Sequence, residues 1–117
     1  PTFLDAAEID IPRCMTGRSQ MSVLDGSAEK IRDHIIVENH HQPTTLHLKT
    51  YVNDRYKLTV YYNQTYGELF DLKSDPDEIN NLWDDPASIG LKQDLMLKYI
   101  HAELGNEPMW MPRIATA

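Results

Sequence analysis

Two adjoining runs of alternating residues, 46–53 and 56–62, constrain the fold of this chain more than any other feature. In the first run, apolar or β-branched side chains occupy every second position, at Leu46, Leu48, Thr50 and Val52. Successive side chains of a strand point to opposite faces, so this period of two predicts a half-exposed strand. Asn53-Asp54 is turn chemistry between the two runs, and we therefore expect an antiparallel β-hairpin.

The flanking segments supply two further strands and a cover for the sheet. The β-branched run at 34–38 and the alternating run at 66–72 predict the first and fourth strands. Aspartate-proline pairs at 75–76 and 85–86 are helix-start signals, which predict a helical turn over 78–83 and a long helix ending at Gly105. One apolar face of that helix is expected to cover the sheet, formed by Ile89, Leu91, Leu95, Met96, Tyr99, Ile100 and Leu104.

The two ends of the chain have a different character. Phe3, Leu4 and Ala7 predict a short helix, whereas the polar, glycine-containing stretch 8–28 predicts an irregular connector. The tail 106–117 carries Trp110 between methionines and prolines, so we expect it to be irregular and to lie against a surface.

The predicted fold class is α+β. A four-stranded antiparallel sheet packs against a long C-terminal helix and is preceded by a short helix and an irregular connector. The predicted organisation is a connecting segment at 1–32, a sheet-and-helix domain at 33–105, and the tail.

Composition narrows the range of partners. The 117 residues carry a formal net charge of −7 with no basic cluster, which argues against nucleic acid as a partner. The longest apolar stretches, such as 35–37, are far too short to span a membrane. The chain opens on Pro1 with no leader-like segment, so we expect it to be part of a longer protein. The one cysteine, Cys14, allows no intramolecular disulfide and leaves the compartment open.

Several segments, taken in order, resemble the C-terminal part of type I sulfatases, the formylglycine-dependent arylsulfatase family of the alkaline phosphatase superfamily. The family pattern is a "YKL" strand, then "ELYDL", then "DPxExxNL". The chain has YKL at 56–58, ELFDL at 68–72 and DPDEINNL at 75–82. Its first nine residues also resemble the family's "PTLLDLAGI" helix, and Gly17-Arg18-Ser19 resembles the family's "GRSL".

The resemblance implies an enzyme in two parts. In the family, an N-terminal catalytic domain carries a formylglycine nucleophile, a calcium ion and the cationic groups that bind sulfate. The C-terminal part completes the fold and contributes to the rim of the pocket that receives a sulfated small molecule or glycan. This chain would be that second part, inert alone and without a cofactor or metal of its own. The alternatives are the same part of a phosphonate or phosphate ester hydrolase, and an independent carbohydrate-binding or interaction module.

Cys14 matches the family's nucleophile only in part. The cysteine-to-arginine spacing of the nucleophile motif is present in 14–18, but Thr16 stands where the motif has proline. We therefore predict a linker cysteine and no catalytic residue in this chain.

Histidines are the candidate substrate contacts. His40, His41 and His47 flank the loop 42–45, near the place where the resemblance brings C-terminal residues toward the substrate. We predict that His40 and His41 contact substrate, supported by Glu38 and Asn39. Metal binding by the three imidazoles and simple solvation of the loop remain open, although no fourth ligand at suitable spacing is evident.

Other motifs have simpler explanations. The acidic residues at 75–78 and 84–85 resemble calcium ligands, yet each group precedes a predicted helix, where capping explains it better. Asn63-Gln64-Thr65 fits the N-glycosylation pattern, which is common by chance. Trp110 is predicted to pack against the catalytic domain, with a carbohydrate platform as the alternative.

Overall fold

A computed structural model describes residues 1–41 and 46–106 of the chain, with the side chain of His41 outside this description. One compact unit comprises Asp33–Leu104, and another includes residues 1–32. The segment 42–45 and the tail with Trp110 lie outside the described residues. Their predicted roles therefore stay predictions.

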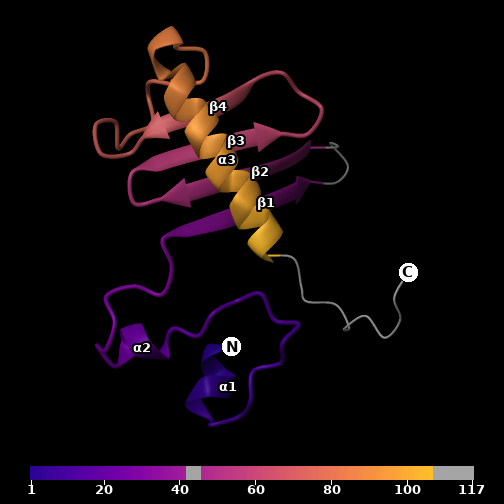
Figure 1. The fold of residues 1–117 in the computed structure, drawn as a ribbon, viewed down its shortest axis with the longest axis vertical. Coiled ribbons are helices and arrows are strands. Elements are labelled where there is room, and N and C mark those ends of the chain that lie inside the picture. Colours follow the sequence, from indigo (N-terminus) through magenta and orange to yellow (C-terminus); the bar gives the residue numbers. More distant parts are fainter. Residues whose placement is uncertain (42–45, 107–117) are drawn as a thin grey trace. The chain divides into compact units, whose positions relative to one another are not determined.

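The unit Asp33–Leu104 is built on a four-stranded antiparallel sheet in the order β1-β2-β3-β4 (Figure 1). The strands are β1 (His34–His41), β2 (Leu46–Asn53), β3 (Tyr56–Tyr61) and β4 (Gly67–Asp71). In the turn between β2 and β3, the Asn53 side chain accepts hydrogen bonds from the backbone N–H groups of Arg55 and Tyr56. The predicted sheet and hairpin are confirmed, and β1 extends three residues further than its β-branched run.

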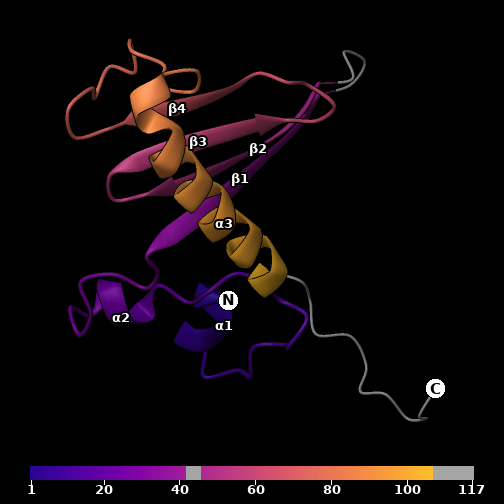
Figure 2. The same ribbon diagram turned by 45° about the horizontal axis from the view of Figure 1, so that its top comes forward.

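The long helix α3 (Ile89–Asn106) crosses one face of this sheet (Figures 1 and 2). It follows a single 3-10 turn, Pro86–Ser88, whose N-cap is Asp85. The Asp85 carboxylate accepts from the backbone N–H of Ala87 and from the Ser88 hydroxyl. Capping chemistry at Asp85-Pro86 therefore starts this helix, as predicted.

The core lies between α3 and the sheet. Its buried members are Tyr51, Leu58, Leu69, Leu95 and Ala102. The three sheet residues occupy one rung across the strands, because Tyr51 pairs with Leu58 and Leu58 pairs with Leu69. Each is therefore on the face that α3 covers.

The predicted apolar face of α3 was only partly right. Leu91, Leu95, Met96 and Tyr99 do pack on the core, together with Ala102, which was not in the prediction. Ile89, Ile100 and Leu104 are exposed instead. The buried stripe is narrow, so residues that a wide helical face would include point outward.

The opposite face of the sheet is less covered. Thr50 and Thr59 are buried at its centre and share a hydrogen bond of 3.0 Å between their hydroxyls. Around them Ile35, Val37 and Leu46 are exposed. Among the described residues of this unit, no helix lies over this face.

The segment after β4 corrects one prediction. A helical turn was expected over 78–83, but the chain there is irregular. Glu78 has a positive φ of 54°, a conformation that interrupts a right-handed helix. The Asp75 carboxylate accepts hydrogen bonds from the backbone N–H groups of Ile79 and Asn80. These are the bonds of a helix cap, but here they stabilise a loop. Leu82 packs against the core.

Asn81 joins this loop to the outer edge of β4. Its Oδ1 accepts from the backbone N–H of Leu69 at 2.9 Å and from that of Trp83 at 3.0 Å. Its Nδ2 donates to the carbonyl oxygen of Gly67 at 3.0 Å. Next to it, the Leu82 N–H donates to the Leu69 carbonyl at 2.8 Å. The loop thereby takes the place of a fifth strand.

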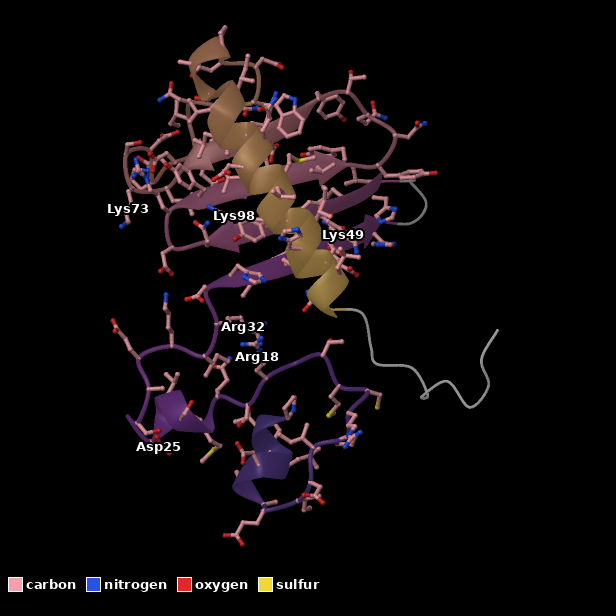
Figure 3. All side chains as sticks on the ribbon, in the orientation of Figure 1. Arg18, Asp25, Arg32, Lys49, Lys73 and Lys98 are labelled. Atoms are coloured by element: carbon pink, nitrogen blue, oxygen red, sulfur yellow. The ribbon has the colours of Figure 1, made fainter. Side chains whose placement is uncertain are left out.

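The N-terminal unit contains two short helices, α1 (Thr2–Ala6) and α2 (Met21–Leu24). The first was predicted, whereas α2 lies in the stretch expected to be irregular. Its N-terminal backbone is held by local side chains, since the Ser19 hydroxyl accepts from the Met21 N–H. Arg18, labelled in Figure 3, donates to the carbonyl oxygen of Ile31. None of the described helices has the length and apolar character needed to cross a bilayer.

We predict that Asn81→Ala lowers the free energy of unfolding by about 2 kcal/mol, because three backbone groups lose their partner. Urea unfolding monitored by circular dichroism measures the change. The matched control is Asn80→Ala, whose side chain makes none of these three bonds and which should unfold within about 0.5 kcal/mol of the parent chain. Equal stability of the two variants would contradict the role assigned to Asn81.

A second prediction concerns Asp71, which forms a two-pronged ion pair with Arg55 at 2.8–3.1 Å. This guanidinium is the main cause that lowers the pKa of Asp71 to about 2 from its ordinary 3.8. The lowered pKa means that the pair stabilises the fold above about pH 4 and that this contribution is lost as the pH falls toward 2.

In Arg55→Ala, the pKa of Asp71 should rise toward 3.8, as NMR titration of the carboxyl carbon would measure. Lys73→Ala removes a neighbouring exposed cation that forms no ion pair with Asp71 through its side chain in the described residues, and it serves as control. An unchanged titration in Arg55→Ala would refute the assignment.

Candidate functional site

The predicted substrate contacts lie at the end of β1. His40 and His41 were expected beside the loop 42–45, after a strand predicted at 34–38, and the structure continues that strand through both of them. The His40 side chain is exposed, while that of His41 lies outside the described residues. Because strand side chains alternate, Glu38 and His40 share the face covered by α3, whereas Asn39 is on the opposite face.

The rings of His40, His47 and Tyr62 form a row across the strands. His40 pairs with His47 in the register of β1 and β2, and the two ring centroids are 3.8 Å apart. On its other side the His47 ring stacks with Tyr62, at 5.4 Å and an interplanar angle of 30°. The Tyr62 N–H donates to the His47 carbonyl, which continues the β2–β3 pairing past the end of β3. The sheet register therefore brings together rings from three segments.

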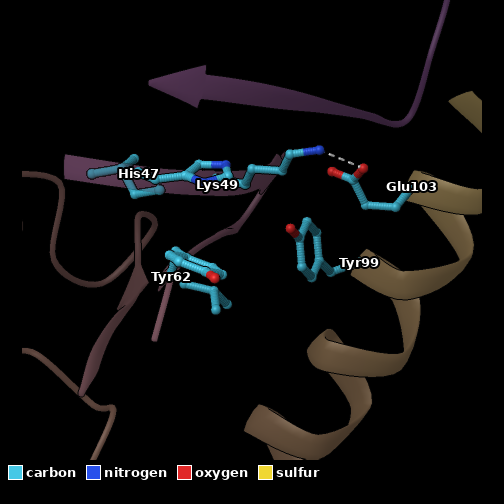
Figure 4. A pocket seen from close by; sticks show the side chains of 7 residues that line it. His47, Lys49, Tyr62, Tyr99 and Glu103 are labelled. Carbon is cyan, nitrogen blue, oxygen red and sulfur yellow. Dashed lines mark hydrogen bonds and ion pairs between the residues drawn. The ribbon is translucent and has the colours of Figure 1, made fainter. Parts of the chain in front are cut away.

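A second group of side chains continues this row toward α3. Lys49 Nζ lies 2.6 Å from Glu38 Oε1 on β1 and 2.8 Å from Glu103 Oε2 on α3. Figure 4 shows the bond from Lys49 to Glu103. These bonds, first with Glu103 and then with Glu38, raise the pKa of Lys49. The bond from Lys49 also lowers the pKa of Glu38. Lys49 and Glu38 are therefore held in their charged forms at neutral pH.

A pocket of about 270 Å³ opens between these strands and α3 (Figure 4). Its lining residues are His47, Leu48, Lys49, Val60, Tyr62, Tyr99 and Glu103. Tyr99 and Glu103 reach it from α3, and burial raises the pKa of the Tyr99 hydroxyl. The phenol is therefore a hydrogen-bond donor at neutral pH.

Sequence reasoning found part of this site. It singled out His40, His47 and Glu38 but missed Lys49, Tyr62 and the helix residues. The period of two in β2 did place Lys49 on the same face as His47. Its partner Glu103 is 54 residues away, and no local pattern indicates such a pairing.

The chain offers no cluster for metal or nucleophilic chemistry in its described part. No group of three or more His, Cys, Asp or Glu side chains there is placed to hold a metal ion. Cys14 is exposed. Asp75 and Asp85, two of the acidic residues that resemble calcium ligands in the sequence, accept hydrogen bonds from backbone N–H groups. Calcium and formylglycine, which the family resemblance implies, therefore have no fitting residues in the described part of this chain.

Comparison with known proteins identifies the family. Residues 1–104 match the family described as "N-sulphoglucosamine sulphohydrolase, C-terminal". Two curated relatives come from Bacteroides thetaiotaomicron. An N-acetylglucosamine-6-O-sulfatase is 29% identical over 82% of this chain, and a Delta 4,5-hexuronate-2-O-sulfatase is 34% identical over 74%. The aligned region is 18% of each relative.

Solved structures agree in fold. A putative sulfatase from Bacteroides thetaiotaomicron has a TM-score of 0.81 and 27% identity, over 92% of this chain and 24% of its own. A phosphonate monoester hydrolase from Silicibacter pomeroyi has a TM-score of 0.80 over the same shares, with 23% identity, which speaks for the fold alone. The chain thus spans about a fifth to a quarter of the proteins it matches. Given a family match over residues 1–104, the chain belongs to the sulfatase family, as its C-terminal domain.

Proposed function

We propose that this domain completes a sulfuric ester hydrolase and forms part of the rim of its substrate pocket. In this proposal 33–105 is the domain itself, 1–32 connects it to the catalytic domain, and 106–117 is a tail. The family match over residues 1–104 is the observation that carries the proposal. The catalytic nucleophile, the calcium ion and the sulfate-binding cations would belong to the catalytic domain.

The residues that identify the family support a structural role. Asn81 and Leu82, from the "DPxExxNL" segment, bind the edge of β4. Leu69, from the "ELYDL" segment, is fully buried beneath α3. These signature residues hold the sheet and helix together, which is what a completing domain requires.

The sheet face opposite α3 is the proposed contact with the catalytic domain. Ile35, Val37 and Leu46 are 42%, 47% and 39% exposed there. Exposed apolar side chains that share one face of a sheet are typical of a surface that another part of a protein covers. A catalytic domain of the same protein is the proposed occupant, because the relatives are roughly four to six times as long as the region they share with this chain.

A sulfated sugar is the proposed substrate class. The two curated relatives are by name sulfatases of an N-acetylglucosamine and of a hexuronate. His40 is exposed at the end of β1, and its neighbour His47 holds its ring from one side. Such an imidazole can donate a hydrogen bond to a sugar oxygen or accept one from a hydroxyl. His41 keeps its predicted role beside it.

We predict that His40→Ala, made in the enzyme that carries this domain, raises KM for a sulfated disaccharide about tenfold, which corresponds to the loss of about one hydrogen bond. The value of kcat should change by less than about twofold, since a rim residue contributes binding and not chemistry. Steady-state kinetics with a sulfated disaccharide provides both constants.

The matched control is His101→Ala, an exposed histidine on α3 that lies outside the pocket lining. It should leave both constants unchanged. A loss of kcat without a change in KM for His40→Ala would argue against a rim contact, as would equal effects of the two variants.

A phosphonate monoester hydrolase is the second candidate, favoured by the fold likeness to the enzyme from Silicibacter pomeroyi. The two proposals differ in the ester that the complete enzyme cleaves. Rates for 4-nitrophenyl sulfate and for a 4-nitrophenyl phosphonate monoester separate them. A clear preference for the phosphonate would overturn the sulfatase proposal and retain the completing role of the domain.

A further inference from the structure

The pocket beneath α3 has the size and walls of a site for a single small ring. Its volume of about 270 Å³ is just below the roughly 300–1,000 Å³ of sites that enclose drug-sized ligands. One wall is aromatic, formed by His47 and Tyr62, and the facing wall is polar, formed by Tyr99 and Glu103 (Figure 4). All of the lining residues belong to the unit Asp33–Leu104.

The aromatic wall is held in place yet open to a ligand. The Tyr62 side chain is 71% exposed, although its ring stacks on His47 at 5.4 Å. Stacking restrains the ring, so little rotamer freedom remains to be lost on binding. The face of an aromatic ring carries partial negative charge, which suits the C–H groups on the face of a sugar ring.

The polar wall offers acceptors and lacks a free cation among the residues that line it. Lys49 lines the pocket, but its ammonium group is engaged by Glu38 and Glu103. The Lys49 ammonium and the two carboxylates together carry a net negative charge, which disfavours the binding of a sulfate or a carboxylate. The pocket therefore selects against the charged part of a sulfated glycan.

Glu103 also presents an unused acceptor. Its Oε2 binds Lys49, whereas Oε1 is buried and accepts no hydrogen bond in the described part of the chain. Leaving a buried acceptor without a donor is unfavourable, because the group has lost its water partners. A ligand hydroxyl that donates to Oε1 would remove this penalty. The Tyr99 hydroxyl also lines the pocket, and its pKa is raised by burial and by its interaction with the Glu103 carboxylate.

We propose that this pocket binds a neutral, hydroxyl-rich sugar ring, stacked on Tyr62 and hydrogen-bonded to Glu103. Its assignment to an unsulfated unit of the substrate glycan rests on the proposed function. The binding itself does not, because it requires only the residues of this domain.

Titration of the 117-residue chain tests the proposal. Cellobiose and N,N′-diacetylchitobiose serve as neutral probes and glucose 6-sulfate as the anionic probe, with NMR shifts of the His47 and Tyr62 rings as the readout. At least one neutral probe should bind with a Kd of about 1 mM, and glucose 6-sulfate at least about tenfold more weakly. Failure of both neutral probes to shift these rings, or tighter binding of glucose 6-sulfate, would overturn the proposal.

Variants separate the two walls. Tyr62→Ala should weaken the neutral probe at least about tenfold, and Glu103→Gln, which keeps the shape but loses the charged acceptor, about three- to tenfold. The control is Tyr66→Ala, a tyrosine that is 53% exposed and does not line the pocket. Unchanged binding in Tyr62→Ala, with an unchanged circular dichroism spectrum, would refute the site.

The outcome is independent of the sulfatase assignment. The binding assay needs no turnover, so a failed titration leaves the proposed function standing. Conversely, a complete enzyme that prefers phosphonate esters would change the substrate and leave the neutral-sugar pocket in place.

Discussion

The outer edge of β4 presents backbone groups that need partners, and Asn81 with its neighbour Leu82 provides them. An edge strand with free N–H and C=O groups is a template for unwanted pairing. Here the Leu69 N–H, the Leu69 carbonyl and the Gly67 carbonyl are all bonded by the loop after β4. The edge is closed without another strand, and the loop becomes fixed to the sheet.

The same attachment determines where α3 begins. Trp83 follows the Asn81 contact, and its ring lies so close to Gly67 that a Cβ at that position would come within 2.4 Å of it. Lys92 on α3 donates to the Trp83 carbonyl and lies over the Trp83 ring. Only glycine at position 67 allows this approach, because any larger residue would displace the tryptophan and with it the first turns of the helix.

Once the start of α3 is fixed, its length determines which of its residues lie beside each strand of the sheet. At about 1.5 Å per residue, the 18 residues of α3 span roughly 27 Å. Leu91 and Leu95, near the beginning of α3, pack on the core. Further along the helix, Tyr99 and Glu103 lie beside β2, where Glu103 forms an ion pair with Lys49. The pocket at that end thus depends on contacts made at the other end of the helix.

Local chemistry explains which features the sequence reveals. Alternation in 46–53 predicts β2, and the Asp85-Pro86 pair predicts the start of α3, because both depend on neighbours in sequence. The same reasoning fails at Asp75-Pro76, where the Asp75 carboxylate stabilises a loop because Asn81 must reach β4. An aspartate at a helix-start signal accepts hydrogen bonds from backbone N–H groups that follow it, and a loop can present such groups as well as a helix can.

The site is less predictable from sequence than the fold, because strand register and the length of α3 determine which of its residues come into contact. His40 and His47 were visible as a cluster in the sequence, but their contact depends on strand pairing, and Glu103 reaches Lys49 from 54 residues away. That long-range pair decides the character of the pocket. A free lysine beside two imidazoles would favour a sulfate, whereas a lysine held by two carboxylates leaves acceptors and aromatic faces.

The net charge of the chain constrains which parts of a substrate this domain could bind in a complete enzyme. The chain carries a formal net charge of −7, so its long-range field repels a polyanionic glycan. At physiological ionic strength that repulsion is screened over about 8 Å, and contacts within the pocket decide what binds. In the proposed enzyme, a sulfated substrate would therefore find its cationic partners on the catalytic domain, while this domain would bind the neutral parts of the same molecule.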